Sequence, residues 1–244
     1  MSMKYQFFVI GSGGTGTYFL KEFSRYLSSG VHCGEVSDLF IFDGDIVEDK
    51  NLTRQAFAEE DIGANKAVVM AEVLNASFGT SWRSMGEYLT DKEQLKSLIK
   101  GSYSDKTYMP VIIGCVDNHG CRLLLEELFS ELDNVAYLDS ANEFYAGESV
   151  FAYRAAGRLV SPCRSHYFPE ILRADKRNRT EISCEELNNV APQHIITNML
   201  AGQVLFSEVC ALLDKKPHPG LVTFDAGEFL MEHVPYKADA EAAA

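Results

Sequence analysis

The chain has 244 residues, and 46% of them are hydrophobic, which is enough for one sizeable core. Its formal net charge of -13 argues against a nucleic acid or an anionic membrane surface as a partner, because both are polyanions. No stretch reaches the roughly 20 apolar residues that a membrane span needs. The six cysteines are scattered without paired spacing, which is typical of a reducing cytoplasm rather than of a disulfide framework.

Over roughly the first 140 residues, runs of β-forming apolar residues alternate with helical patterns, as in a parallel sheet with crossover helices. Strands are predicted at 5–10, 38–42, 82–89, 111–116 and 135–138. Helices are predicted at 15–27, 65–78, 91–100 and 118–132, with an aspartate capping the third. The predicted fold class is therefore α/β, a Rossmann-type, mainly parallel sheet with flanking helices.

From Glu148 onwards the pattern changes to antiparallel strands, predicted at 149–154, 221–225 and 229–234. The segment 173–189 is charged and has no apolar period, so we expect a mobile loop that crosses the surface. A strongly apolar helix is predicted over 195–213, and the tail 236–244 is expected to be disordered. Since there is no repeat and no linker, residues 1–244 are predicted to form one domain.

A glycine-rich loop joins the first predicted strand to the first helix, with the sequence Gly11-Ser-Gly13-Gly14-Thr-Gly16. Glycines here permit a tight turn, and the helix N-terminus presents free N–H groups to a phosphate. Asp43 ends the second strand, where an acidic residue accepts hydrogen bonds from ribose hydroxyls. These features predict a nucleotide site, with helix–sheet packing as the alternative role of the glycines. No Gly-Lys-Ser/Thr closes the loop, so cations for a triphosphate must come from elsewhere.

Cations do follow in the next segments. The second strand runs into Asp43-Gly-Asp45-Ile-Val-Glu-Asp-Lys-Asn51-Leu-Thr-Arg54-Gln55, and Gly63-Ala-Asn-Lys66 opens the helix after it. The fourth strand ends in Cys115-Val-Asp117-Asn118. With the glycine loop, these motifs in this order resemble the ThiF/MoeB/HesA family, the bacterial relatives of ubiquitin-activating enzymes. The resemblance runs from Val9 to about Leu213.

The resemblance implies that the chain binds ATP with Mg²⁺ and adenylates the C-terminal glycine carboxylate of a small ubiquitin-like carrier protein of the ThiS/MoaD type. In that reaction two anions approach each other and pyrophosphate leaves, so positioning and charge neutralisation are the main requirements. The family pattern assigns the phosphates to Arg54 and Lys66, with help from Asn51. It assigns Mg²⁺ to Asp117, since one carboxylate plus substrate phosphates is an ordinary magnesium environment.

Each assignment competes with a simpler one. Asp45 is placed in the nucleotide site by the family pattern, in the environment of the magnesium ion. Arg54 has the alternative of a surface cation, and Lys66 that of a solvated helix residue. Asp117 has the alternative of capping the helix that begins at Asn118, because aspartate is a common N-cap. The three together at these spacings favour the nucleotide site.

Cys184 lies in a segment that resembles the family's crossover loop, where a cysteine links covalently to the carrier in some relatives. Acidic and basic residues both flank it, so the sequence leaves its pKa, and a thioester or persulfide-type transfer step, open. Relatives also carry an N-terminal helix whose arginine reaches the ATP of the partner subunit. We expect that cation to be absent or replaced here.

Structural zinc is not expected. Many relatives bind it through two CxxC pairs, and here only Cys163 and His166 resemble such a pair, with histidine in place of the second cysteine. Closure of a four-ligand site would need His218 or His233, which lie far along the chain. Cys163 is therefore predicted to be a small buried residue.

A homodimer is predicted, because the segment 195–213 is apolar around much of its circumference and the family resemblance favours a dimer over burial within one subunit. Two other functions stay open. An NAD(P)-dependent Rossmann oxidoreductase also uses a glycine loop and an acid after the second strand, but gives Arg54, Lys66 and Asp117 no role. A non-catalytic scaffold would bind nucleotide and carrier without activating either.

Overall fold

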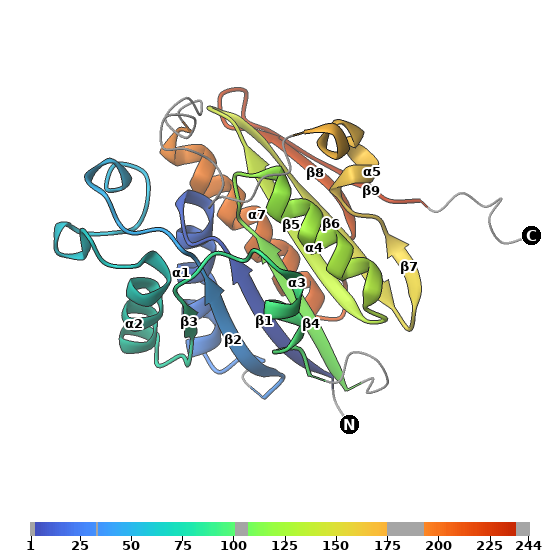
Figure 1. Ribbon diagram of the computed structural model, residues 1–244. Helices are drawn as coiled ribbons and strands as arrows, with labels where there is room; N and C mark the ends of the chain where they lie inside the picture. The colour runs from blue at the N-terminus through green and yellow to red at the C-terminus, as the bar shows by residue number, and fades with distance from the viewer. Residues whose placement is uncertain (1–2, 33, 101–106, 175–192, 238–244) are drawn as a thin grey trace, which may run out of the picture.

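The structure, a computed structural model, describes residues 3–32, 34–100, 107–174 and 193–237. Within these residues one sheet runs in the order β3-β2-β1-β4-β5-β6-β8-β9, with β7 paired to β6 (Figure 1). The strands are β1 Lys4–Ile10, β2 Val36–Phe42, β3 Arg83–Met85, β4 Tyr108–Gly114, β5 Val135–Asn142, β6 Ala146–Ala155, β7 Arg158–Ser161, β8 Gly220–Asp225 and β9 Leu230–Pro235. The helices are α1 Gly14–Ser28, α2 Lys66–Phe78, α3 Lys92–Lys96, α4 His119–Glu131, α5 Arg164–Tyr167 and α7 Ile195–Leu213.

The sheet changes direction where the sequence pattern changes. Strands β3, β2, β1, β4 and β5 pair in parallel. The later pairs, β5 with β6, β6 with β7 and β8, and β8 with β9, are antiparallel. The predicted fold class is therefore confirmed, including its antiparallel continuation.

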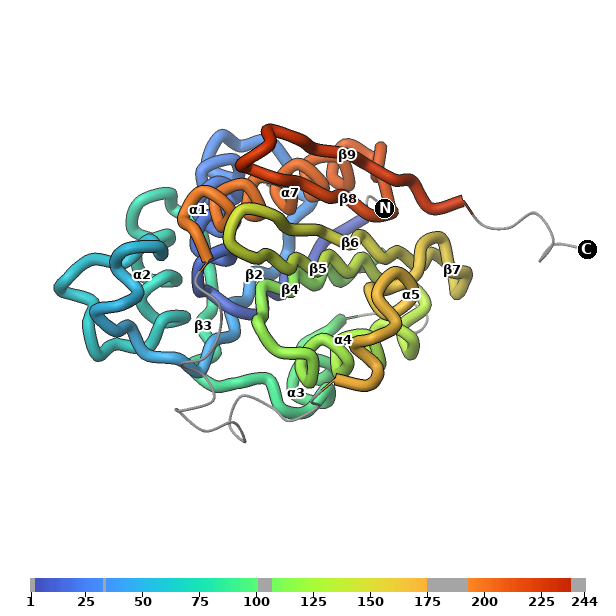
Figure 2. Tube along the Cα trace, turned by 90° about the horizontal axis from the view of Figure 1, so that it is seen from above, coloured from blue at the N-terminus to red at the C-terminus, as the bar shows by residue number. Residues whose placement is uncertain are grey.

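Two hydrophobic cores cover the two faces of the sheet. In β1, Phe7 and Val9 pack with residues of α1, α2 and α7, whereas Phe8 and Ile10 pack with residues of α3 and α4. Seen from above, α1 and α7 lie over one face, and α3 and α4 lie under the other (Figure 2). Because both faces are covered, the central strands contain continuous apolar runs, such as 7–10 in β1 and 111–113 in β4, rather than a strict alternation.

Helix α7 packs against α1, β5 and β6. Its 19 residues are long and apolar enough to cross a membrane by length and composition alone. The prediction that no segment is long and apolar enough for a membrane span is therefore wrong for this helix. Its contacts and its place over the sheet in Figure 1 are those of a helix that helps to form a core.

Several element boundaries differ from the prediction. The strand expected at 82–89 covers only Arg83–Met85, because Tyr88 turns back over Gly44 and Gly86 lies against Asn65. The helix expected at 91–100 covers only Lys92–Lys96, although Asp91 caps it as predicted by accepting a hydrogen bond from Glu93 N (3.0 Å). β7, α5 and a 3₁₀ turn at Pro169–Arg173 were not predicted. Of the predicted loop 173–189 and tail 236–244, only 173–174 and 236–237 are among the described residues.

Candidate nucleotide-binding site

The glycine loop connects β1 to the N-terminus of α1, and three of its glycines, Gly11, Gly14 and Gly16, have no room for a Cβ. Gly11 has a φ of +93°, and a Cβ there would lie 2.5 Å from the carbonyl oxygen of Cys115. A Cβ on Gly16 would overlap the Gly11 carbonyl oxygen. Gly13 caps α1 without any side-chain hydrogen bond to the first turn, so no side chain of the cap occupies those N–H groups. Such a helix end binds anions.

Asp43 joins this loop to the segment after β2. Its carboxylate accepts hydrogen bonds from Ser12 N (2.7 Å), from Ser12 Oγ (2.9 Å) and from Asp45 N (2.9 Å). The residue is buried, and burial raises the pKa of its carboxyl, as does the nearby charge of Asp45, while Lys66 opposes both. Asp43 therefore fixes the two loops against each other, and its role as ribose acceptor stays a prediction.

Lys66 is the first residue of α2, and its ammonium group points back to the loop rather than to solvent. Its side chain is only 6% exposed, and Nζ lies 3.1 Å from Asp45 Oδ2. Asp45 also accepts a hydrogen bond from the Tyr88 hydroxyl. The alternative of a solvated helix lysine is therefore wrong.

The position of Lys66 is set by the preceding residue, Asn65. Its Oδ1 accepts from Val68 N and caps α2, while its Nδ2 donates to the carbonyl oxygens of Asp43 (2.9 Å) and Asp45 (3.2 Å). One side chain thus holds the helix end and the acidic loop together. The motif Gly63-Ala-Asn-Lys66 indicated the lysine, but the bridging amide was not predicted.

Asn51 ends a short 3₁₀ segment, Asp49–Asn51, and Arg54 lies in the turn that follows it. Asn51 is buried, and its Oδ1 accepts a hydrogen bond from Glu48 N (2.9 Å), so it shapes this turn. The Arg54 guanidinium is partly buried and makes no hydrogen bond or ion pair with the described residues. Gln55 is buried beside Gly13, and its Oε1 has no partner within the described part of the chain.

Asp117 lies just beyond the end of β4, at the same sheet edge as the glycine loop, and is exposed. It does not cap α4; Asn118 does, through a hydrogen bond from Cys121 N to its Oδ1 (2.8 Å). The capping alternative for Asp117 is therefore wrong. Arg122 holds the turn before it, since its Nη2 donates to the carbonyl oxygen of Val116 (2.6 Å).

Arg122 also belongs to a buried charge network, which fixes its position under the turn's carbonyl group. Asp139, at 1% exposure, accepts from both Arg122 (3.2 Å) and Arg164, and Arg164 also donates to Glu148 (2.6 Å). Removing one partner of such a network leaves an uncompensated buried charge. Sequence reasoning missed all four residues, because they come from α4, β5, β6 and α5 and form no local motif.

A second missed group lies on the other side of the glycine loop. Thr15 Oγ1 donates to Asn142 Oδ1 (3.2 Å), and Asn142 Nδ2 donates to Asn198 Oδ1 (2.7 Å). These residues come from α1, β5 and α7. The one available signal was a polar residue, Asn198, within an otherwise apolar helix.

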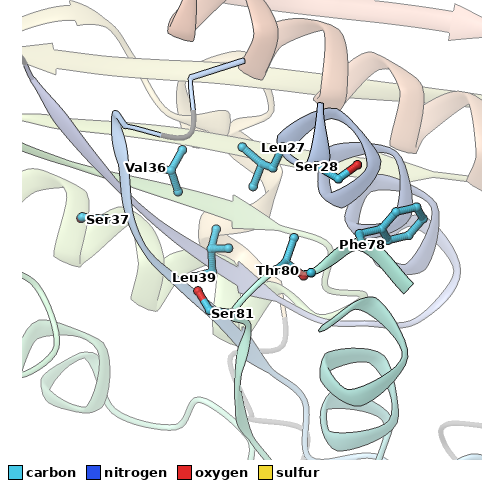
Figure 3. Close-up of a pocket in the computed structure, with 9 residues that line it drawn as sticks. Leu27, Ser28, Val36, Ser37, Leu39, Phe78, Thr80 and Ser81 are labelled. Carbon is cyan, nitrogen blue, oxygen red and sulfur yellow. The ribbon is translucent and has the colours of Figure 1, made fainter. Parts of the chain in front are cut away.

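The remaining predicted sites have separate outcomes. Cys184 lies outside the described residues. Cys163 is partly buried rather than fully buried, and burial raises the pKa of its thiol well above the usual range. The described residues contain no group of three or more histidine, cysteine or acidic side chains that could hold a metal ion. A groove of about 250 Å³ between Leu27, Val36 and Phe78 contains none of the predicted site residues (Figure 3).

The glycine loop, the buried acid and the buried lysine thus meet at the carboxyl edge of a parallel sheet, where proteins of the Rossmann-type fold have their nucleotide sites. The sequence matches the ThiF family over residues 3–242, and the chain belongs to that family.

Two curated relatives are similar to half of the chain. Ubiquitin-activating enzyme E1 2 of Arabidopsis thaliana is 30% identical over 122 residues, which are 49% of this chain and 11% of that protein. Ubiquitin-activating enzyme E1 1 of the same plant is 30% identical over 125 residues, with the same two shares. The matched region is therefore about a tenth of the length of these relatives.

Solved structures share the fold over nearly the whole chain. The structure of E. coli MccB with AMPCPP and MccA superimposes with a TM-score of 0.67 at 15% identity, covering 96% of this chain and 65% of that one. PaaA superimposes with a TM-score of 0.65 at 13% identity, covering 95% and 64%. The chain spans just under two thirds of the length of these proteins.

Proposed function

We propose that this protein uses ATP to adenylate the C-terminal glycine carboxylate of a small ubiquitin-like carrier protein. The observation that carries the proposal is the buried Lys66 ammonium, held by Asp45 at the edge of the glycine loop. Asp45 offsets part of the desolvation cost of this buried ammonium group, and an approaching polyphosphate would offset more of it. The ubiquitin-activating relatives, and MccB solved with an ATP analogue and MccA, favour the same activity.

The reaction balances without any oxidant or reductant. A carboxylate oxygen of the carrier attacks the α-phosphorus of ATP and forms an O–P bond, while the bond to the α,β-bridging oxygen breaks. Pyrophosphate leaves, and the carrier becomes an acyl adenylate. Lys66 and Arg54 are assigned to the leaving phosphates, where they offset the growing charge. The N–H groups at the start of α1 are assigned to the remaining phosphate.

The residues present fit magnesium only as an ion shared between one protein carboxylate and the substrate phosphates. Asp117 offers an exposed carboxylate at the sheet edge where the glycine loop lies, and the described residues contain no cluster that could hold a metal ion by itself. One carboxylate completed by substrate phosphates is a common arrangement for Mg²⁺. When bound, the ion would neutralise charge on the phosphates.

The test is carrier-dependent exchange of labelled pyrophosphate into ATP. Arg54→Ala and Asp117→Ala are each expected to slow exchange by about 10²-fold, the scale of losing one transition-state charge contact. Asp117→Ala should also change the dependence on magnesium concentration. Unchanged exchange in both variants would reject these assignments, and tight binding of a nicotinamide dinucleotide in place of ATP would favour the oxidoreductase alternative.

We further propose a cytoplasmic homodimer. Exposed apolar side chains at the start of α7, Ile195, Ile196 and Met199, offer a surface for a second subunit. Light scattering at micromolar concentration tests this, because a monomer would have the 27.1 kDa mass of one chain.

Cys184 is proposed to accept the activated acyl group as a thioester. The thiolate would attack the acyl carbon, and AMP would leave. Cys184→Ala should then keep pyrophosphate exchange while losing any covalent carrier–enzyme species that hydroxylamine cleaves. An adduct that persists in this variant would assign the step to another cysteine.

A further inference from the structure

Asn198 is an unusual residue for its helix. It lies in the first turn of the apolar helix α7 and is fully buried, at 0% exposure. Its Nδ2 group has no hydrogen-bond partner in the part of the chain that the structure describes. A buried donor without an acceptor is costly, so such an atom in a native site points to a ligand that completes it.

The orientation of this amide follows from its neighbours. Asn142 accepts from Thr15 through Oδ1, so its Nδ2 faces Asn198 and donates to Asn198 Oδ1 at 2.7 Å. Gln193 Nε2 donates to the backbone oxygen of Asn142 (3.1 Å) and holds the same strand end. The oxygen of the Asn198 amide is therefore engaged, and the N–H end is the one left over.

That N–H end faces the N-terminus of α1. A Cβ on Gly14, the first residue of this 15-residue helix, would lie 2.6 Å from Asn198 Cγ and closer still to Nδ2. Glycine at position 14 is thus what allows the amide to reach the helix end. The start of α1 and an unpaired, buried donor aimed at it form one anion-binding corner.

The amide and the cations lie on opposite sides of the glycine loop. In the sheet order, β2 follows β1 on one side, and β4 and β5 follow on the other. The helices follow the same order, with α2 on one flank of α1 and α7 on the other (Figure 2). Lys66 is the first residue of α2. A displacement at phosphorus has its attacking and leaving oxygens roughly in line. If Arg54 and Lys66 hold the leaving pyrophosphate, the carboxylate approaches from the Asn198 side.

We infer that Asn198, oriented by Asn142, is the subsite for the carrier's terminal carboxyl group and donates a hydrogen bond to the acyl oxygen that does not attack. The inference rests on the adenylation proposed above. A neutral amide suits this task, because it orients the carboxylate without the strong ion pair that a cation would form in the ground state. Because Asn198 contacts the carboxyl group that reacts, it contributes to binding of the acceptor and not to binding of the nucleotide.

The test compares two ligands by calorimetry on the full chain. One is AMP, and the other is a sulfamoyl-linked, non-hydrolysable mimic of an N-acetylglycyl adenylate. The wild-type protein should bind the mimic more tightly than AMP, because only the mimic carries the acyl oxygen. Asn198→Ala should lower affinity for the mimic by about 10-fold, the scale of one hydrogen bond, and change AMP affinity by less than about 2-fold. Gln203→Ala, at an exposed position on the same helix, is the matched control and should change neither.

If Asn198→Ala does not fold, Asn198→Ser carries the test, because it stays neutral and polar but removes the amide Nδ2 donor. Equal losses for AMP and the mimic would show a merely structural role and overturn the inference. Equal binding of AMP and the mimic by the wild-type protein would also overturn the inference. That result would leave the nucleotide site and the proposed function intact. Failure of the wild type to bind any adenine nucleotide would reject the proposed function together with the inference.

Discussion

The two sides of the glycine loop differ in chemistry. The side formed by β2 and α2 is charged, with Asp43, Asp45 and Lys66 within one hydrogen-bonded group. The side formed by β5 and α7 is neutral, with Asn142 and Asn198 joined through their amides. Charge is needed where pyrophosphate departs, whereas orientation is needed where a carboxylate arrives. The difference assigns leaving group and acceptor to separate halves of one site.

The largest expected effect is on the charged side. Lys66→Ala should lower carrier-dependent pyrophosphate exchange by about 10²-fold, because it removes a buried cation from the leaving phosphates and leaves Asp45 without its partner. Lys21→Ala, at an exposed position on α1, is the control and should leave the rate unchanged. A rate in Lys66→Ala equal to that of the control would remove the charged side from the mechanism.

A steric test addresses the boundary between the two sides. Gly14→Ala should weaken binding of AMPCPP by about 10-fold, because the new methyl group overlaps the Asn198 amide and displaces the loop. The double variant Gly14→Ala with Asn198→Gly should recover most of this affinity, measured by calorimetry. If the second substitution gives no recovery, the contact between loop and helix does not set nucleotide binding.

A smaller effect is expected from Tyr88, whose hydroxyl donates to Asp45. Tyr88→Phe removes the hydroxyl that donates to this carboxylate and should slow exchange by only about 3-fold, because Asp45 keeps its ion pair with Lys66. Tyr145→Phe, at 45% exposure, is the control. A loss as large as that of Lys66→Ala would mean that Tyr88 contacts substrate directly.

Helix α7 carries a second buried group, Glu208, whose neutral form is favoured by burial. Glu208 is buried on α7, accepts from Ser149 Oγ (2.8 Å), and has its pKa raised by burial from 4.5 to about 8. The folded protein then holds a proton that the unfolded chain releases above pH 4.5. Stability from this group is therefore complete below pH 4.5 and is lost as pH rises towards about 8, with a slope of at most about 1.4 kcal/mol per pH unit.

Glu208→Gln should flatten that dependence. Thermal unfolding should show the variant and the wild type closest in stability near pH 5 and the variant gaining steadily up to pH 8 or so, since glutamine stays neutral. Glu22→Gln, in an ion pair with Arg25 on α1, is the control. Parallel pH curves for Glu208→Gln and wild type would show that Glu208 is charged in the folded protein.

The charged side could be predicted from the sequence, and the neutral side could not. Asp43 directly follows the end of β2, and parallel topology brings strand ends together whatever the details of packing. Lys66 opens α2 and was predicted from the resemblance of its local motif to that of the family. Asn142 and Asn198 come from distant elements, and their pairing depends on how α7 lies against α1. The short β3 has the same origin, since the packing of Tyr88 over Gly44 and not strand propensity ends it. Asp117 was placed correctly at its strand end, but the arginines that hold its turn came only from tertiary structure.

The most direct test of adenylation is the intact mass of the acceptor. The protein is mixed with ATP, Mg²⁺ and a small β-grasp protein ending in glycine, sought first in the neighbouring reading frame. Adenylation predicts that the β-grasp protein gains the mass of one adenylyl group in the presence of the wild type, and that Lys66→Ala and a carrier lacking its final glycine abolish the gain. An acceptor whose mass does not change, in the presence of a protein that binds AMPCPP, would contradict adenylation and identify a nucleotide-binding scaffold instead.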